Sequence, residues 1–139
     1  GRSAAVALVA LDKGPQLCDT YGQPVMDQLH CFVGNQWKKH FDTPTEQVVC
    51  RLTGSVFVVG SVDTTGPQLA ARMQELYEQM PHECITTTGM MHRVQFTMSG
   101  AAAGLDEVEA KNWPALYELC DARLRKVQAS GGDRIGCAE

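Results

Sequence analysis

The sequence lacks several features that would narrow its function. No apolar run approaches the roughly 20 residues of a membrane-spanning helix, and the longest, Ala4 to Leu11, has the length of a buried strand. No Asn-x-Ser/Thr glycosylation site is present. The sequence also lacks a strongly basic region: its basic residues are scattered, and 12 basic and 16 acidic residues give a net charge of −4. A general nucleic-acid binder needs a basic stripe, so this balance argues against that class.

Motifs of metal and phosphate sites are also missing. No two of the four histidines have H-x-x-x-H spacing, and no two cysteines form C-x-x-C. Gly54 and Gly60 are isolated in predicted strands, and Gly131-Gly132 follows a predicted helix, so no glycine-rich loop leads into a helix. We therefore predict no cofactor, no cofactor-binding residue and no metal-binding residue.

Catalytic arrangements are equally poor. A Cys–His nucleophile pair at His82 and Cys84 is conceivable, but Cys84 is more economically one half of a disulfide. His92 and Arg93 are neighbours in a predicted strand and point to opposite faces, so they cannot line one cleft. We predict no catalytic residue, and we expect His82 and His92 to be dispensable for activity.

Six cysteines are the most informative feature that is present. Their number is even, and they are dispersed over the chain, which is typical of disulfides across a fold rather than of a metal site. We predict three disulfides in an oxidising compartment among Cys18, Cys31, Cys50, Cys84, Cys120 and Cys137. The helical phase turns Cys31 away from the sheet, so its expected partner is Cys18, Cys120 or Cys137. A cytosolic protein with six buried free thiols is the alternative.

Length and composition predict one globular domain over residues 1–139. Hydrophobic residues make up 44% of the chain and charged residues 20%, which is ordinary for a folded domain. The chain begins at Gly1 rather than Met, so we expect a mature form whose leader has been removed.

Hydrophobic periodicity predicts four strands and three helices. The strands are expected at 4–11, 48–53, 56–62 and 90–99, with a two-residue turn at Gly54-Ser55 and a small-residue loop at 101–104. The helices are expected to begin near Pro24, Pro67 and Pro114, after turn or capping residues. The second helix should stop at Pro81.

This order predicts an α+β fold with an antiparallel sheet of about four strands. It is the β-α-β-β-α-β, or ferredoxin-like, order with an extra C-terminal helix. The first and third strands are central in that topology, and here they are the two runs that are apolar on both faces. Disulfides are expected to stabilise the fold.

Size, dispersed cysteines and element order together resemble small secreted cysteine-rich effectors of filamentous fungi, including avirulence proteins and virally encoded killer toxins. The resemblance covers the whole chain but includes no specific motif. It implies a secreted, extracellular, non-enzymatic virulence protein that acts by binding a host protein, with no nucleic acid and no membrane span. A secreted hydrolase or ribonuclease-like enzyme and a cytosolic ferredoxin-like regulatory domain are the alternatives.

Overall fold

The computed structural model describes residues 4–41, 47–53, 56–87 and 91–136. Its helices are α1 (Gly14–Tyr21), α2 (Gln23–Phe41), α3 (Gly66–Gln79), the short 3₁₀ helix η1 (Leu105–Glu107) and α4 (Trp113–Ala129). Its strands are β1 (Ala4–Leu11), β2 (Gln47–Thr53), β3 (Val56–Val62), β4 (Glu83–Thr86), β5 (His92–Gln95), β6 (Met98–Gly104) and β7 (Arg134–Gly136).

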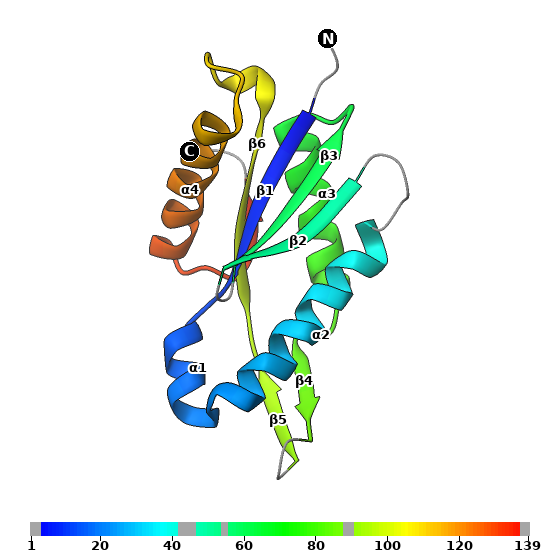
Figure 1. Cartoon of the computed structure of the whole chain (residues 1–139), viewed down its shortest axis with the longest axis vertical. Coiled ribbons are helices and arrows are strands. Elements are labelled where there is room, and N and C mark those ends of the chain that lie inside the picture. Colours follow the sequence, from blue (N-terminus) through cyan, green and yellow to red (C-terminus); the bar gives the residue numbers. More distant parts are fainter. Residues whose placement is uncertain (1–3, 42–46, 54–55, 88–90, 137–139) are drawn as a thin grey trace.

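Five of these strands form one mixed sheet in the order β2-β3-β1-β6-β7 (Figure 1). The central strand β1 pairs antiparallel with β3 on one side and with β6 on the other, and β7 adds to β6 in parallel. Seven of the eight residues of β1 lie opposite a β3 residue, from Ala4–Val62 to Ala10–Val56. Buried, uniformly apolar sequence is what a strand with neighbours on both edges and helices on both faces requires.

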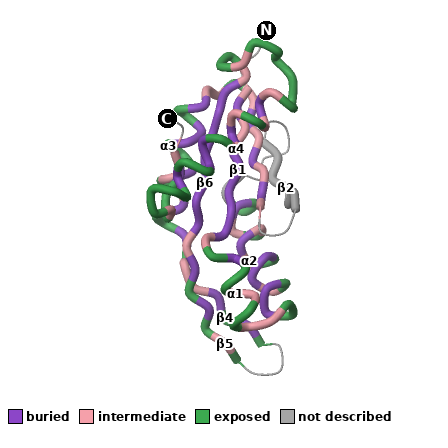
Figure 2. Tube along the Cα trace, turned by 90° about the vertical axis from the view of Figure 1, so that its left-hand side faces the viewer, coloured by how far each residue is buried: buried purple, intermediate pink, exposed green. Residues whose placement is uncertain are grey.

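Helices cover both faces of this sheet. One face packs against α2 and α3 around Trp37, Phe57 and Met73, all nearly inaccessible to solvent. The other face packs against α4 through Leu116, Cys120 and Leu124. The buried trace is concentrated in the sheet, and exposed positions dominate the outer sides of the helices (Figure 2). The domain therefore has three layers, with two apolar clusters separated by the sheet.

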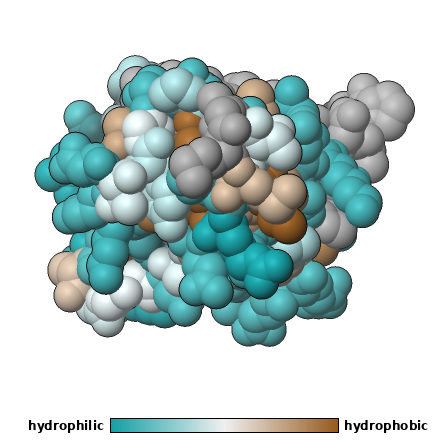
Figure 3. Space-filling model, turned by 90° about the horizontal axis from the view of Figure 1, so that it is seen from below, coloured by the Kyte–Doolittle hydropathy of each residue, from teal (hydrophilic) through white to brown (hydrophobic). Residues whose placement is uncertain are grey.

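A two-stranded hairpin of β4 and β5 extends beyond the end of the main sheet, beside α1 and α2 (Figure 1). Cys84 pairs with Val94 and both are buried, whereas the opposite face carries the exposed Ile85 and the Arg93–Glu83 ion pair at 3.3 Å. Viewed onto this end, the surface is mostly hydrophilic with scattered hydrophobic side chains (Figure 3). The alternation of buried and exposed residues fits a hairpin with one packed face.

Much of the predicted architecture is confirmed. The fold is α+β, the strands that begin at Ala4 and Val56 are neighbours, and β2 is at an edge. Helices are present at all three predicted places, and the capping box of α3, in which Thr65 accepts from the Gln68 amide, explains its start. The predicted turn at 54–55 lies outside the described residues.

The prediction of a four-stranded antiparallel sheet is wrong in two respects. The sheet is mixed and has five strands, because the short β7 was not recognised. The predicted strand at 90–99 is divided between β5, which belongs to the hairpin, and β6, which begins at Met98. The alternation that indicated the strand therefore comes from the hairpin and not from the main sheet.

The predicted loop at 101–104 is instead the buried second half of β6. All seven residues of β6 are buried, although none after Met98 is larger than serine or alanine. Small residues are needed here because neighbours approach closely: a Cβ on Gly100 would lie 2.6 Å from the Ile135 Cδ1 atom and 3.1 Å from the Leu8 carbonyl oxygen. Close packing against neighbouring residues, and not the β propensity of the individual residues, therefore explains why this segment is a strand.

The expected disulfides are not found among the described cysteines. Cys18, Cys31, Cys84 and Cys120 are all free thiols. Cys31 is exposed, as its helical phase predicts, but it has no bridge to Cys18 or Cys120. Cys84 and Cys120 lie in the two apolar clusters on opposite faces of the sheet, where a buried thiol behaves as a small hydrophobic side chain. Apolar packing, not cross-linking, stabilises the part of the fold that is described.

Candidate functional site

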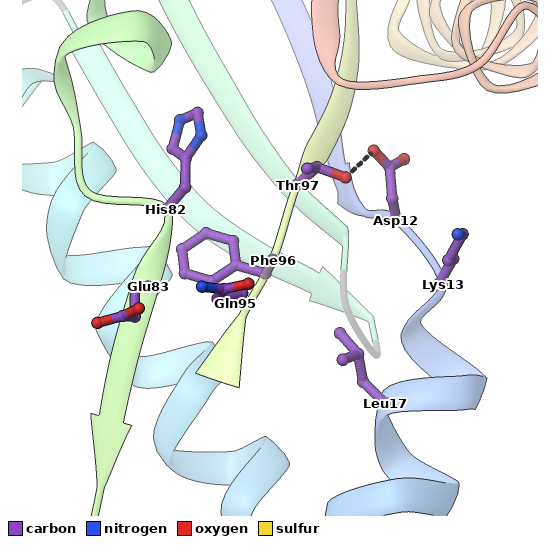
Figure 4. A pocket seen from close by; sticks show the side chains of 8 residues that line it. All are labelled: Asp12, Lys13, Leu17, His82, Glu83, Gln95, Phe96 and Thr97. Carbon is purple, nitrogen blue, oxygen red and sulfur yellow. Dashed lines mark hydrogen bonds between the residues drawn. The ribbon is translucent and has the colours of Figure 1, made fainter. Parts of the chain in front are cut away.

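A cavity of about 560 Å³ opens where β1 ends, between the start of α1 and the base of the β4–β5 hairpin (Figure 4). Its volume is within the range of small-molecule sites, roughly 300–1,000 Å³. Side chains from three separate segments of the chain line it: Asp12, Lys13, Leu17, His82, Glu83, Gln95, Phe96 and Thr97. The long-range pairing of β1 with β6 brings these segments together.

Asp12 is held rigidly at the cavity wall. Its carboxylate accepts hydrogen bonds from the Thr97 hydroxyl at 2.7 Å, from the Ser99 hydroxyl and from the Asp133 amide at 3.0 Å. Figure 4 shows Thr97 and Asp12 facing each other across the strand ends. With three donors already bound, this carboxylate acts as a structural acceptor that joins β1, β6 and the turn before β7.

Aromatic side chains form the opposite wall. The His82 ring stacks on Tyr77 with centroids 4.3 Å apart, and its Nε2 atom lies 2.7 Å from the Tyr77 carbonyl oxygen. Phe96, which is buried, also neighbours His82, with ring centroids 6.2 Å apart. The cavity side of this wall is formed by His82 and Phe96, whose rings are tilted by 44° to each other, and aromatic rings of this kind can contact a planar ligand ring edge to face or in an offset stack.

Lys13 provides a positive charge at the rim. It is the residue before α1 and adopts a left-handed conformation with φ of 55°, which turns the chain sharply from β1 into the helix. Its side chain is exposed and forms no ion pair or hydrogen bond with any described residue. The cation is therefore available to a negatively charged group in solution.

The residues weighed in the sequence as possible catalysts are not brought together. His82 lines the cavity, but Cys84 points into the apolar cluster, where burial raises the pKa of its thiol and keeps it protonated. His92 contacts Tyr21 edge to face, at 5.5 Å between centroids, and does not line the cavity. The structure thus offers no Cys–His nucleophile pair in the described hairpin.

Sequence reasoning missed Asp12, Lys13 and Thr97 as site residues. One usable signal existed, since polar residues directly after a buried strand often lie at the edge of a sheet where ligands bind. No cluster of three or more histidine, cysteine, aspartate or glutamate side chains able to hold a metal ion occurs within the described ranges. Across those ranges, too, every helix is too short or too polar to cross a bilayer.

A mixed sheet with helices on both faces and a cavity at the end of its central strand defines an α+β domain suited to binding a small molecule. The family model of the diguanylate cyclase GGDEF domain matches residues 1–134. Because the match spans nearly the whole chain, this protein belongs to the GGDEF domain family. No curated protein sequence matches the chain.

Solved structures of GGDEF domains share the fold. The FimX GGDEF domain of Pseudomonas aeruginosa is 21% identical, with a TM-score of 0.82 over 97% of this chain and 80% of that one. The DgcB GGDEF domain of Caulobacter crescentus, solved with c-di-GMP, is 18% identical, with a TM-score of 0.80 over 97% and 77%. An active GGEEF domain of a Vibrio cholerae diguanylate cyclase is 14% identical, with a TM-score of 0.72 over 98% and 82%.

The family match corrects the functional predictions. The resemblance to fungal effectors is wrong, and so are the secreted location and the non-enzymatic class that it implied, because the family is one of diguanylate cyclases. Size, cysteine number and element order are shared by many unrelated proteins, so a likeness without a motif had little specificity. Neither of the two alternatives, a secreted hydrolase or a regulatory domain, is better supported.

The predicted partners are also wrong. A host protein was expected and nucleic acid was excluded, whereas the family is named for guanine nucleotide chemistry. A negative net charge argues against binding of a nucleic-acid polymer, because a polymer needs many cations spread over the protein surface. A single nucleotide needs only a few well-placed groups, so a net charge of −4 is no argument against it.

Proposed function

We propose that this chain is a guanine-nucleotide-binding domain of cyclic-di-GMP signalling. The observation that carries the proposal is the family match over residues 1–134, which includes every described helix and every described strand before β7. The DgcB domain, which has the same fold, was solved with c-di-GMP bound. Binding of GTP or c-di-GMP is thus the property to expect first.

The cavity at the end of β1 has features that suit such a ligand. Lys13 is a free cation for a phosphate, and the His82 and Phe96 rings that line the cavity are aromatic groups that a base can contact. Gln95 adds an exposed amide at the rim, with both donors and an acceptor. Phosphate charge, a planar ring and hydrogen-bonding edges are the three things that a guanine nucleotide presents.

Synthesis of c-di-GMP is a separate question from binding, because this chain lacks the five-residue sequence motif after which its family is named. Neither Gly-Gly-Asp-Glu-Phe nor the Gly-Gly-Glu-Glu-Phe of the active Vibrio cholerae domain occurs in the sequence. The nearest partial matches are Gly104-Leu105-Asp106-Glu107-Val108 and Gly131-Gly132-Asp133-Arg134-Ile135.

Neither partial match provides acids for a metal. In the first, Glu107 is occupied by Arg123, and in the second Asp133 accepts from Tyr77. Phosphoryl transfer relies on metal ions and positioned charge to stabilise the transition state. We therefore expect this domain to bind nucleotide and to make c-di-GMP much more slowly than the Vibrio cholerae domain.

Calorimetry on the purified chain tests the proposal. GTP and c-di-GMP should bind more tightly than ATP, and Lys13→Gln should weaken binding by about tenfold, which is roughly 1.4 kcal/mol for a lost charge-assisted contact. Lys38→Gln is the matched control, since Lys38 is an exposed lysine on α2 away from the cavity. Absence of heat with both guanine nucleotides at millimolar concentration would refute nucleotide binding.

A second measurement addresses synthesis. Chromatography of a GTP incubation with Mg²⁺ should show far less c-di-GMP for this chain than for the Vibrio cholerae domain at equal concentration. Equal rates would show that acids outside the described residues complete the site, and the expectation drawn from the missing motif would be wrong.

A further inference from the structure

The short strand β7 is attached to the edge of the sheet by a short pairing with β6 and by a side-chain hydrogen bond from α3. Its three residues pair in parallel with Ser99, Gly100 and Ala101 of β6. Ile135 is its one buried side chain, while Arg134 is exposed. The Ile135 amide donates to the Gln74 side-chain oxygen of α3 at 2.7 Å. Little apolar burial therefore opposes separation of β7 from β6.

The turn before β7 is the second weak point. Gly131, Gly132 and Asp133 all have positive φ, at 116°, 71° and 58°. Asp133 adopts this conformation despite its Cβ, which costs free energy unless contacts offset it. A Cβ on Gly132 would lie 2.6 Å from the Ser99 hydroxyl and 2.8 Å from the Asp12 carboxylate, so the turn is pressed directly against the network around Asp12.

Two hydrogen bonds offset that cost. The Asp133 amide donates to Asp12 at 3.0 Å, and the Asp133 carboxylate accepts from the Tyr77 hydroxyl. The same hydroxyl accepts from the Met98 amide at 2.8 Å, so Tyr77 joins β6 to the turn before β7. Burial raises the pKa of Tyr77, followed in size by the hydrogen bond to Asp133, so the hydroxyl remains a donor.

We propose that β7 is a releasable latch, which the hydrogen bonds of Asp133 to Tyr77 and Asp12 hold closed. Opening separates Arg134–Gly136 from β6 while β1, β3 and β6 stay paired. Asp12 also lines the cavity, and Tyr77 stacks on His82, which lines it too. Release of β7 would therefore change the contacts that position these two cavity residues. The proposal concerns the free protein and does not depend on nucleotide binding.

Native-state hydrogen exchange measured by NMR tests the latch. In the wild type, the Ile135 amide should exchange through an opening that is nearly independent of low denaturant concentration, whereas β1 amides should exchange with the full denaturant dependence of global unfolding. Tyr77→Phe should speed Ile135 exchange by about tenfold or more, the range of one hydrogen bond to a charged group. The ratio of Ile135 to β1 exchange should rise as well.

Two further variants separate the hydrogen bond from backbone strain. Asp133→Asn keeps an acceptor and tolerates positive φ, so its exchange should stay near that of the wild type. Asp133→Gly accepts the same backbone conformation but removes the acceptor, so Ile135 exchange should rise as in Tyr77→Phe. Tyr117→Phe is the matched control, because the described structure gives the Tyr117 hydroxyl no hydrogen bond.

The outcomes are decisive in both directions. Local, denaturant-insensitive opening at Ile135 that responds to Tyr77→Phe and Asp133→Gly but not to Tyr117→Phe supports the latch. Exchange of Ile135 with the same denaturant dependence as β1, in the wild type and in every variant, would overturn it, because β7 would then leave only when the whole domain unfolds.

Discussion

The two faces of the sheet are packed in different ways. Under α2 and α3 the cluster contains large side chains such as Trp37, Phe57 and Met73. Under α4 the sheet contributes Leu8 and three alanines, and the helix supplies Leu116, Leu124 and Cys120. Large side chains fill the space on the first face. On the second face the strand residues are small, and α4 packs directly against the strands. Each face should therefore fail in its own way, by a cavity or by a clash.

Trp37→Ala should produce the largest effect, because it leaves a cavity on the face that large side chains fill. Trp37 is fully buried, and truncation of a buried aromatic side chain costs about 3–5 kcal/mol. Urea denaturation followed by circular dichroism measures the change in the free energy of unfolding. A loss below about 1 kcal/mol would show that this face repacks freely, and the contrast between the faces would disappear.

Ala101→Leu should have the next largest effect, through a clash on the α4 face. Ala101 is fully buried in β6 beneath α4, and added volume in a packed core costs about 1–3 kcal/mol. The same denaturation experiment applies. Ala101→Gly is the control for the strand itself, and its loss of about 1 kcal/mol or less should be smaller than that of the leucine variant.

Glu107→Gln sharpens the comparison, because the α4 face also contains an ion pair. Arg123 is almost buried on α4 and donates to Glu107 Oε1 at 2.7 Å, and this bond holds the pKa of the Glu107 carboxyl below its usual range. A lowered folded-state pKa contributes stability above the unfolded value of about 4.3 and loses it as pH falls through the folded value.

The Glu107→Gln variant should therefore be less stable than the wild type by roughly 1–2 kcal/mol at pH 7. The difference should shrink below about pH 4. Denaturation at a series of pH values checks the trend. Arg125→Ala is the control on the same helix, since the exposed Arg125–Asp121 pair at 3.0 Å should contribute less than about 0.5 kcal/mol. A pH-independent difference would contradict a role for the carboxylate charge.

Sequence reasoning predicted the elements that have one dominant periodic signal. The stripe of α2 from Val25 to Trp37 is buried as its helical spacing requires, and the doubly apolar β1 is the central strand. The second half of β6 was missed because Gly100 and its alanines have weak strand propensity, and their burial follows from pairing with β1 and from packing against α4 and Ile135. Those contacts join residues far apart in the chain, which no local window contains.

The candidate site was harder to predict for the same reason. Asp12 is far from His82 and Thr97 in the sequence, and it meets Thr97 only when β1 pairs with β6. The cysteines were misread because dispersed thiols have the same spacing whether they are bridged or packed. Burial decides the matter for Cys120: its environment raises the pKa of the thiol to about 12, which leaves it a poor nucleophile for disulfide exchange.

The central place of β1 has a consequence for the order of events during synthesis. β1 is made before both of its partners, β3 and β6, and Ala5 lies opposite Gly104. A ribosome must therefore extend the chain through residue 104 before the strand has neighbours on both edges. Until then its apolar run, Ala5 to Leu11, remains partly uncovered and available to chaperones or to other nascent chains.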